Sequence, residues 1–363
     1  MSRVPFQRPR PAGIAAIAAH YAHSEEIGWY TRGPAVALLG ERVAALAGAA
    51  HGVPVSSATS GIMVALRALA GAPDRRRLVI VPSFTCAAVA GAVEWAGFTP
   101  LFVDVERAGW HPDPAAVADA LAEHGGAIAA VLAAATFGTP PAPGLIDAWT
   151  TAARDAGVPL LFDAAAGLGS TGAAGRVTAY SFEATKPSGA GEGGVMVTDD
   201  AELADTLRRL ANYGVQGTVV ADAVGLNAKL SELGAAAALA TLDGLADALA
   251  ARRARGAALA ERLTAAGAVL QDGAVASSWD AVHVVLETAE AREAAVARAR
   301  ELDVEVRTLW DPPLHRQPAW AGSTVPRFGL AATEDLASRS LALPMAADLS
   351  EDEAERVARV VTG

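Results

Sequence analysis

The sequence contains very little cysteine and no long apolar run. Cys86 is the only cysteine among 363 residues, so no disulfide can form within the chain, and a disulfide-stabilised secreted domain is excluded. The longest apolar stretch, at about residues 127–137, is too short to cross a bilayer. The first residues, with Pro5, Arg8 and Pro9, lack a signal-peptide core. We therefore expect a cytoplasmic protein without a membrane partner.

Positive charge is also in deficit. Lys and Arg total 29 against 40 Asp and Glu, which gives a net charge of −11. Such a chain has no long-range attraction for phosphate backbones, so we expect no nucleic-acid partner, although a local basic pocket for an anionic ligand remains open. The seven histidines show no metal-ligand spacing, and we expect no metal site.

What the sequence does contain is an alternation of short apolar runs with helical periodicity. The expected strands are 53–58, 78–82, 100–105, 127–136, 159–164, 177–182 and 194–198, and the expected helices are 34–49, one starting near 61, 85–96, 114–122 and 146–156. This order predicts an α/β fold with a mostly parallel, doubly wound sheet covered by helices on both faces. Ligands bind such sheets at the carboxyl ends of the strands.

The pattern changes in the second half of the chain. A long helical region at 230–265 is interrupted by glycines, and it is followed by an expected strand at 281–286, a helix at 289–300 and a strand at 304–308. Ser350 and Glu353 form a capping box that begins the last helix. We expect a large domain over residues 1–245, including an N-terminal arm of weak periodicity, and a smaller C-terminal α/β domain over 246–363.

One glycine motif points to a nucleotide cofactor but lacks the right context. Residues 167–172 read GLGSTG and follow an apolar strand. A dinucleotide fingerprint also requires a helix directly afterwards, whereas residues 177–182 have the pattern of a strand. We interpret the segment as a glycine-rich turn.

Asp163 and Lys186 together indicate a specific chemistry. Asp163 ends an apolar strand, where a carboxylate is costly to bury without a partner, and Lys186 lies 23 residues later after another strand. Taken singly, they could be a turn-capping aspartate and a solvated lysine. As a pair they match the needs of pyridoxal 5'-phosphate (PLP), which requires an amine for the internal aldimine and a carboxylate for its pyridine nitrogen.

A phosphate cradle is the third requirement of PLP. Residues 57–61 read SATSG between a strand and a helix start, where backbone N–H groups and the helix dipole favour an anion. Thr59 and Ser60 add hydroxyl groups, and Ser181 could reach the same phosphate. The same turn would also serve simply as a helix N-cap.

These residues lie within a longer set of short motifs. The set comprises 56–61 (SSATSG), 81–85 (VPSFT), 102–105 (FVDV), 163–165 (DAA), 180–186 (YSFEATK), 191–194 (GEGG), 225–227 (GLN), 230–232 (LSE), 313–319 (PLHRQPA) and 343–345 (LPM). In this order and spacing the chain resembles the DegT/DnrJ/StrS-type PLP-dependent aminotransferases. The resemblance covers almost the whole sequence and implies the fold-type-I architecture, with a seven-stranded-type sheet between helices.

The resemblance also implies roles for individual residues. Lys186 would carry PLP and act as the catalytic residue, and Asp163 would pair with the pyridine nitrogen. Thr59, Ser60, Gly61 and Ser181 would surround the phosphate, and Cys86 and Ala166 would flank the cofactor ring. Because active sites of this family form at a homodimer interface, Asn227 of one subunit would contact the phosphate bound by its neighbour. Tyr30, Arg32 and His315 would lie on the substrate side.

Two positions depart from the family pattern. Cys86 occupies the place of an aromatic residue that stacks on the cofactor, and Ala166 replaces the usual Gln or His. Aromatic stacking contributes roughly 0.5–1.5 kcal/mol beyond area burial, so its loss would weaken PLP binding by about tenfold unless Phe84 or another ring substitutes. Cys86 could also be a nucleophile, but no base adjoins it and a packing role is the simpler interpretation.

The function predicted by these features is transfer of an amino group from glutamate or glutamine to a keto-sugar, nucleotide-linked, or to a related cyclic ketone. Arg307 and Arg316 are candidates for binding a diphosphate or carboxylate, or are surface residues. The alternatives are a PLP enzyme of the same fold that performs elimination, dehydration or racemisation, and a non-catalytic regulatory homologue. Dehydratases of this family place His where this chain has Lys186, which argues against that variant.

Overall fold

The computed structural model describes residues 2–322 and 329–363, except residues 216 and 218. A sheet of seven strands in the order β1-β7-β6-β5-β4-β2-β3 lies at its centre. The strands are β1 (His51–Val55), β2 (Leu78–Pro82), β3 (Thr99–Val103), β4 (Ile128–Ala134), β5 (Leu160–Asp163), β6 (Val177–Ser181) and β7 (Gly194–Thr198). β7 runs antiparallel to both of its neighbours, β1 and β6, and the other neighbouring strands pair in parallel. The predicted α/β fold with a mostly parallel sheet is confirmed.

Both faces of the sheet are buried because its side chains alternate between two apolar cores. In β5, Leu160 and Phe162 belong to one core and Leu161 to the other, as the two-residue period of a strand requires. The helices around the sheet are α2 (Pro34–Ala47), α3 (Ala58–Ala70), α4 (Ala87–Trp95), α5 (Pro114–His124), α6 (Pro143–Asp155), α7 (Ala201–Leu210) and α8 (Glu232–Asp243). Helices α2, α5, α6 and α8 cover one face, and α3, α4 and α7 cover the other.

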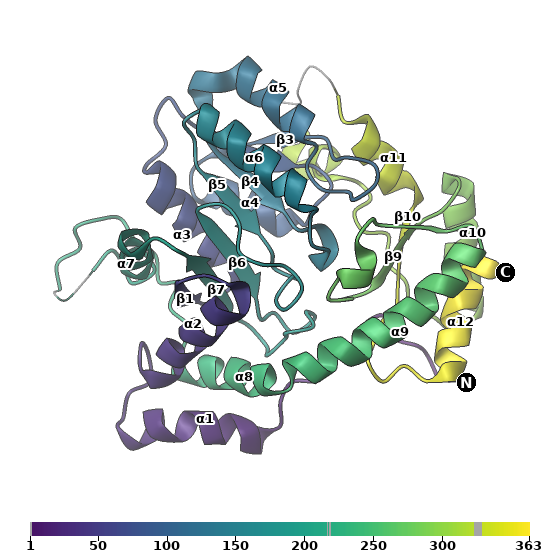
Figure 1. Cartoon of the computed structure of the whole chain (residues 1–363), viewed down its shortest axis with the longest axis horizontal. Coiled ribbons are helices and arrows are strands. Elements are labelled where there is room, and N and C mark those ends of the chain that lie inside the picture. The colour runs from purple at the N-terminus through teal and green to yellow at the C-terminus, as the bar shows by residue number, and fades with distance from the viewer. Residues whose placement is uncertain (1, 216, 218, 323–328) are drawn as a thin grey trace.

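A second set of elements follows α8. It comprises α9 (Leu245–Ala265), β8 (Val269–Leu270), β9 (Val282–Val285), α10 (Ala289–Glu301), α11 (Ala331–Arg339), β10 (Ser340–Leu343) and α12 (Glu351–Thr362), with β9 central in a three-stranded sheet. Figure 1 shows α9 running from the large sheet to these C-terminal elements. Leu249 near its start packs in a core of the large sheet, whereas Leu259 and Leu263 pack with β9 and α12.

The glycine-interrupted helical region is two helices bent by 55° at Gly244. The break adjoins residue 245, where we divide the chain, and that division stays a prediction. By length and composition this bent pair could span a membrane, whereas no single described helix is long and apolar enough to do so.

Three sequence predictions differ from the structure. The first strand ends at Val55, and α3 begins at Ala58, because Ser57 and Ser60 form a reciprocal capping box three residues earlier than expected. Residues 304–308 form no strand and make single bridges, Val304 to Val4 and Arg307 to Ala342. The N-terminal arm contains a helix, α1 (Ile14–Glu26), which its weak periodicity did not predict.

The N-terminal arm is attached to the fold through a buried glutamate. Glu232 at the start of α8 is fully buried and accepts hydrogen bonds from Ser24 Oγ (2.6 Å) and from the N–H groups of Gly33 (2.8 Å) and Ala35 (2.8 Å). It therefore caps α2 in place of a local N-cap side chain, which Gly33 cannot supply. This contact fixes the position of residues 29–33, which connect α1 to α2.

Candidate active site

A cavity of about 290 Å³ lies at the carboxyl ends of β2, β4, β5 and β6. Its lining includes four predicted site residues, Cys86, Asp163, Ala166 and Lys186. The second set of elements closes it from the opposite side with Asp280, His283, Arg307 and Trp310, among others. A larger cavity of about 420 Å³ elsewhere contains neither Asp163 nor Lys186, so size does not identify the reactive site here.

Asp163 is one of the residues that line this cavity. Its Oδ1 accepts the N–H of Ala165 at 2.9 Å, and no hydrogen bond occupies Oδ2 within the described part of the chain. Burial raises the pKa of Asp163, while the Ala165 N–H and the charge of Lys186 act against that rise. A buried carboxylate of this kind is stabilised by a cationic N–H donor, and the protonated pyridine nitrogen of PLP is such a donor.

Lys186 is held on a short turn beyond β6. Its N–H donates to Glu183 O at 2.9 Å, and its carbonyl accepts the N–H of Gly189 at 2.8 Å. A Cβ at Gly189 would lie 2.5 Å from the carbonyl oxygen of Ala184, so the turn closes only with glycine there. Lys186 consequently lines the same cavity as Asp163, from beyond the next strand of the sheet.

The residues predicted to hold the phosphate lie around Gly194. Gly194 pairs with Ser181 on one side and with Val55 on the other, and a Cβ at Gly194 would lie 2.5 Å from the backbone nitrogen of Ala58. The first turn of α3 and Ser181 thus meet at one glycine. Amides of a helix start, with the positive end of the helix dipole, suit a phosphate.

The hydroxyl groups of the cradle are not equally available. Ser60 Oγ is already bonded to the N–H of Ser57 (3.1 Å) and to Ser57 O (2.9 Å), and Ser181 Oγ accepts the N–H of Glu183 at 3.1 Å. No hydrogen bond involves Thr59 Oγ1 within residues 2–215. Of the three predicted hydroxyl groups, that of Thr59 is the one left without a hydrogen bond in these residues. Gly61 packs against Met196 and Val55.

The aromatic rings beside the cavity come from a different place than expected. Phe84 is fully buried and does not line the cavity. Phe137, just beyond β4, lines it and is stacked between His283 (centroids 3.5 Å apart) and Trp310 (4.4 Å). Cys86, which stands where the resemblance predicts a ring, is the exposed N-cap residue of α4 and lines the cavity.

Asp280 and His283 also line this cavity, and the sequence did not predict them. Asp280 Oδ1 accepts the N–H of Ala281 at 2.9 Å and lies 3.2 Å from His283 Nε2. Burial acts to raise the pKa of Asp280, but the His283 hydrogen bond and the charges of His283 and Lys186 lower it. The pair sits 94 residues or more beyond Lys186, and no local motif marks it.

The remaining predicted residues do not line this cavity. Tyr30 is exposed, and Arg32 lines the larger cavity together with Lys229. Asn227 Oδ1 accepts a hydrogen bond from Lys229 Nζ at 2.7 Å. His315 lies between Ser83 Oγ, 2.7 Å from its Nδ1, and Glu334 Oε1, 3.2 Å from its Nε2.

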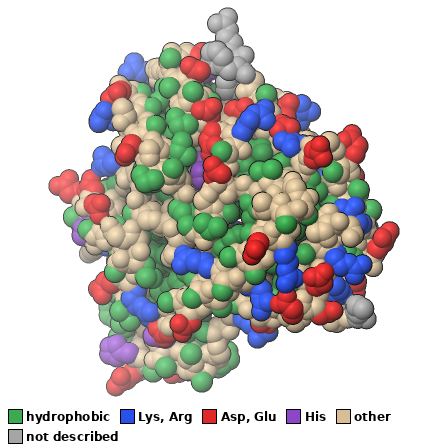
Figure 2. Space-filling model, turned by 45° about the vertical axis from the view of Figure 1, so that its right-hand side comes forward, with side chains coloured by type: hydrophobic (Ala, Val, Ile, Leu, Met, Phe, Trp, Pro, Cys, Tyr) green, Lys and Arg blue, Asp and Glu red, His purple; other side chains and the backbone are tan. Residues whose placement is uncertain are grey.

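Two further predictions concern cations and metals. Arg307 lines the Lys186 cavity, whereas Arg316 pairs with Glu334 on an exposed surface. Within the described residues no group of three or more His, Cys, Asp or Glu side chains could hold a metal ion. On the face shown in Figure 2, acidic and basic side chains are interspersed rather than segregated.

Comparison with known proteins places this geometry in a family. Residues 13–362 match the DegT/DnrJ/EryC1/StrS aminotransferase family. The UDP-N-acetyl-3-dehydro-alpha-D-glucosamine 3-aminotransferase of Acidithiobacillus ferrooxidans is 33% identical over 327 residues, 88% of this chain and 85% of that protein. Protein Rv3402c of Mycobacterium tuberculosis is 31% identical over 370 residues, 99% of this chain and 89% of that protein.

Solved structures agree with the match. The structure of DesI in the presence of its TDP-sugar product has a TM-score of 0.89 and is 31% identical, covering 100% of this chain and 93% of that one. The resemblance predicted from the motifs is confirmed, and so is the fold-type-I architecture that it implied.

Proposed function

The chain belongs to the DegT/DnrJ/EryC1/StrS aminotransferase family, and we propose that it transfers an amino group from glutamate or glutamine to a nucleotide-linked keto-sugar. Members of this family are PLP-dependent transferases, so the predicted cofactor and enzyme class are confirmed. The observation that carries the proposal is the meeting of Asp163 and Lys186 in one cavity. The α3 start and Ser181 lie beyond them at Gly194.

PLP fits the described residues. Asp163 offers an unoccupied carboxylate oxygen for the pyridine nitrogen, Lys186 an amine for the aldehyde, and the start of α3 a set of amides for the phosphate. When bound, PLP supplies an electron sink that stabilises negative charge on the carbon next to the transferred nitrogen.

The residues of the chain perform the other tasks. The carboxylate of Asp163, buried at the end of β5, would hold the ring nitrogen in its protonated form through a charge-assisted hydrogen bond. Lys186, once its amine is free, carries the proton between the two carbons at either end of the transferred nitrogen. Asp280 and Arg307 line the opposite wall, where the rest of the substrate would lie.

The acceptor is proposed from the relatives and from the wall chemistry. The 33% identical relative is named for a UDP-linked 3-keto-sugar, and DesI for a TDP-sugar product. A wall with Asp280, His283 and Thr136 offers both donors and acceptors for hydroxyl groups. Arg307, whose Nη2 lies 2.6 Å from Glu305 Oε1, lines the cavity and is the cation that we assign to a carboxylate or a diphosphate.

We further propose a cytoplasmic homodimer in which each subunit completes the other's site. Asn227, Tyr30 and Arg32 lie outside the Lys186 cavity in one chain, as residues intended for a neighbouring subunit would. Exposed apolar side chains accompany them, including Trp29, Tyr213 and Leu226. Sedimentation of the purified holoenzyme as a monomer at micromolar concentration would contradict this assembly.

The attachment of PLP can be tested sharply because the chain has just two lysines, Lys186 and Lys229. Reduction of the PLP-loaded enzyme with borohydride should fix the cofactor on Lys186, as read by peptide mass. Lys186→Ala should lose both the label and the absorption band of the bound cofactor. Lys229→Ala, the matched control, should keep the label, and a label on Lys229 alone would refute the proposed site.

The reaction type is tested by half-reactions. Glutamate or glutamine should convert the bound cofactor to its amine form, and a keto-sugar nucleotide should then restore the starting spectrum. Absence of conversion with every amino donor tried would exclude transamination and leave elimination or racemisation to account for the site.

A further inference from the structure

The N-terminal strap, residues 2–10, crosses the second set of elements before the chain enters α1. Val4 is fully buried, and its N–H donates to Asp303 O at 2.9 Å while Glu305 N–H donates to Val4 O at 2.9 Å. The strap therefore adds a short parallel bridge beside Val304. It packs in the same core as Leu259 and Val282.

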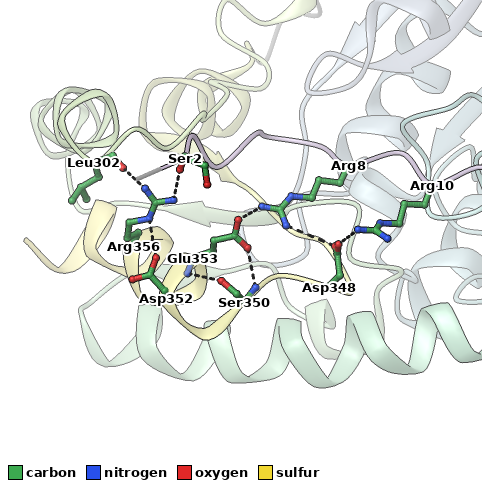
Figure 3. Close-up of polar contacts among 9 residues, drawn as sticks. All are labelled: Ser2, Arg8, Arg10, Leu302, Asp348, Ser350, Asp352, Glu353 and Arg356. Carbon is green, nitrogen blue, oxygen red and sulfur yellow. Dashed lines mark hydrogen bonds and ion pairs between the residues drawn. The ribbon is translucent and has the colours of Figure 1, made fainter.

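Ion pairs fasten the strap to α12 and to the segment before it. Figure 3 shows Arg8 reaching Glu353 and Asp348, and Arg10 reaching Asp348. Arg356 donates to the carbonyl of Ser2 at 2.8 Å. The Arg8 hydrogen bond is the main cause that lowers the pKa of Glu353 to about 2, against its burial. The anchor is thus charged at neutral pH.

Glu353 is itself rigidly held. Its Oε2 accepts the N–H of Ser350 at 2.9 Å, and Ser350 Oγ accepts the N–H of Glu353 at 3.2 Å, which is the capping box predicted from the sequence. Arg8 consequently binds a carboxylate that is held in the first turn of α12. This contact fixes where Arg8 lies on the second set of elements.

The fastened strap places Phe6 and Gln7 at the Lys186 cavity. Phe6 is buried, its N–H donates to Glu305 Oε2 at 3.3 Å, and the Arg307 guanidinium lies 5.3 Å from its ring centroid. Gln7 lines this cavity and also a neighbouring one of about 150 Å³ that shares Lys186. Its side-chain amide has no hydrogen-bond partner within the described residues and is half-buried.

We propose that Gln7 is a specificity-determining residue that hydrogen-bonds a hydroxyl group of the acceptor sugar, and that the strap's ion pairs hold it in place. This inference rests on the proposed function. A neutral amide offers two donors and one acceptor, which matches a hydroxyl and gives no ionic attraction to a carboxylate. The glutamate donor is better served by Arg307, so Gln7 should distinguish the two half-reactions.

The contribution of Gln7 to acceptor binding should depend on how firmly the strap is held, more than on the surface area that Gln7 buries. A backbone segment that is fixed before binding loses little entropy when the ligand arrives. The strap provides that order, since residues on both sides of Gln7 are held, Phe6 by burial and Arg8 by Glu353. Loosening Arg8 should therefore weaken acceptor binding without removing any atom from the cavity.

The test compares Gln7→Ala with wild type in separate half-reactions. The acceptor probe is UDP-N-acetyl-3-dehydro-alpha-D-glucosamine, and TDP-linked 3-keto- and 4-keto-sugars complete the panel. We expect KM for the acceptor to rise about threefold to tenfold, the effect of one neutral hydrogen bond. We expect kcat, the glutamate half-reaction and the absorption band of bound PLP to stay within twofold of wild type.

Two further variants separate a specificity role from a structural one. Arg8→Ala should raise the acceptor KM as Gln7→Ala does, while Arg3→Ala, which removes an exposed arginine 3.7 Å from Glu305, should change neither KM nor the melting temperature. Removing from the acceptor the hydroxyl group that Gln7 binds should raise KM in wild type but raise it less in Gln7→Ala.

The outcomes distinguish this inference from the function it rests on. An unchanged acceptor KM in Gln7→Ala, with a working wild type, overturns the role of Gln7 alone, and so does an equal loss in both half-reactions. If wild type accepts no sugar of the panel, the proposed acceptor and this inference fail together.

Discussion

The substitution Gly194→Ala tests whether the start of α3 and β7 form the phosphate cradle. A Cβ on Gly194 would lie 2.5 Å from the nitrogen of Ala58, 2.7 Å from the carbonyl carbon of Ser57 and 3.0 Å from the Cα of Ala58. All three atoms are backbone, so no side chain can rotate away. The shortest contact falls 0.9 Å short of the 3.4 Å at which ordinary contact begins.

The magnitude follows from that overlap. Overpacking a close-packed site costs typically 1–3 kcal/mol, and the backbone contacts here place Gly194→Ala at the upper end, about 2–3 kcal/mol. With an unfolding entropy of about 2.1 cal/mol/K per residue, that loss lowers the melting temperature of the apoenzyme by about 3–4 °C.

The effect on the cofactor should be larger than the effect on stability. A shift of about an ångström at Ala58 breaks at least one hydrogen bond between a backbone amide and the phosphate. Hydrogen bonds to charged groups contribute about 1.5–3 kcal/mol, so the Kd for PLP should rise roughly tenfold to a hundredfold. Titration of apoenzyme with PLP, followed by its absorption band, measures this.

Gly91→Ala is the matched control. Gly91 lies within α4 with nothing within 4 Å of a built Cβ, and alanine in a helix is better than glycine by about 0.8–1.0 kcal/mol. It should raise the melting temperature slightly and leave the Kd unchanged. If Gly194→Ala has the same Kd for PLP and the same melting temperature as wild type, the phosphate does not lie at this glycine.

Two other substitutions test the anchor and the ring position. Glu353→Gln should cost about 2 kcal/mol of unfolding free energy at neutral pH, because the ion pair with Arg8 lowers the pKa of Glu353 to about 2. A lowered carboxyl pKa stabilises the fold above the unfolded value of 4.5 and loses that contribution as pH falls through about 2. The difference between wild type and variant in urea denaturation should therefore shrink between pH 5 and pH 2, and a constant difference would contradict the ion-pair account. Cys86→Tyr restores a ring at the cofactor and should lower the Kd for PLP by up to about tenfold; an unchanged Kd would mean that Phe137 and its stacked neighbours already supply the contact.

Local sequence determined much of the large sheet. Strands such as Leu78–Pro82 were predicted at their observed bounds, because buried parallel strands consist of continuous apolar runs that need no partner to be recognised. The last helix was predicted at its observed start, since Ser350 and Glu353 satisfy each other's backbone within one turn. Asp163 stood out because a carboxylate ends an apolar run.

Other features depended on residues far away in the chain. Residues 304–308 have the composition of a strand, but Val304 is bridged by Val4 and Arg307 by Ala342, one residue each. Helix α1 has weak periodicity and is positioned by contacts with α8, including Ser24 with Glu232. No local pattern can show which distant backbone or carboxylate will be available.

The sequence by itself therefore determined the family, the sheet and the pairing of Asp163 with Lys186, since each rests on residue type at short spacing. Only the tertiary structure decided the opposite wall of the cavity. Asp280 faces Lys186, and Gln7 is held beside it by an Arg8–Glu353 pair that spans 345 residues. Such contacts form because separate elements pack together, and the spacing of the residues in the sequence does not predict them.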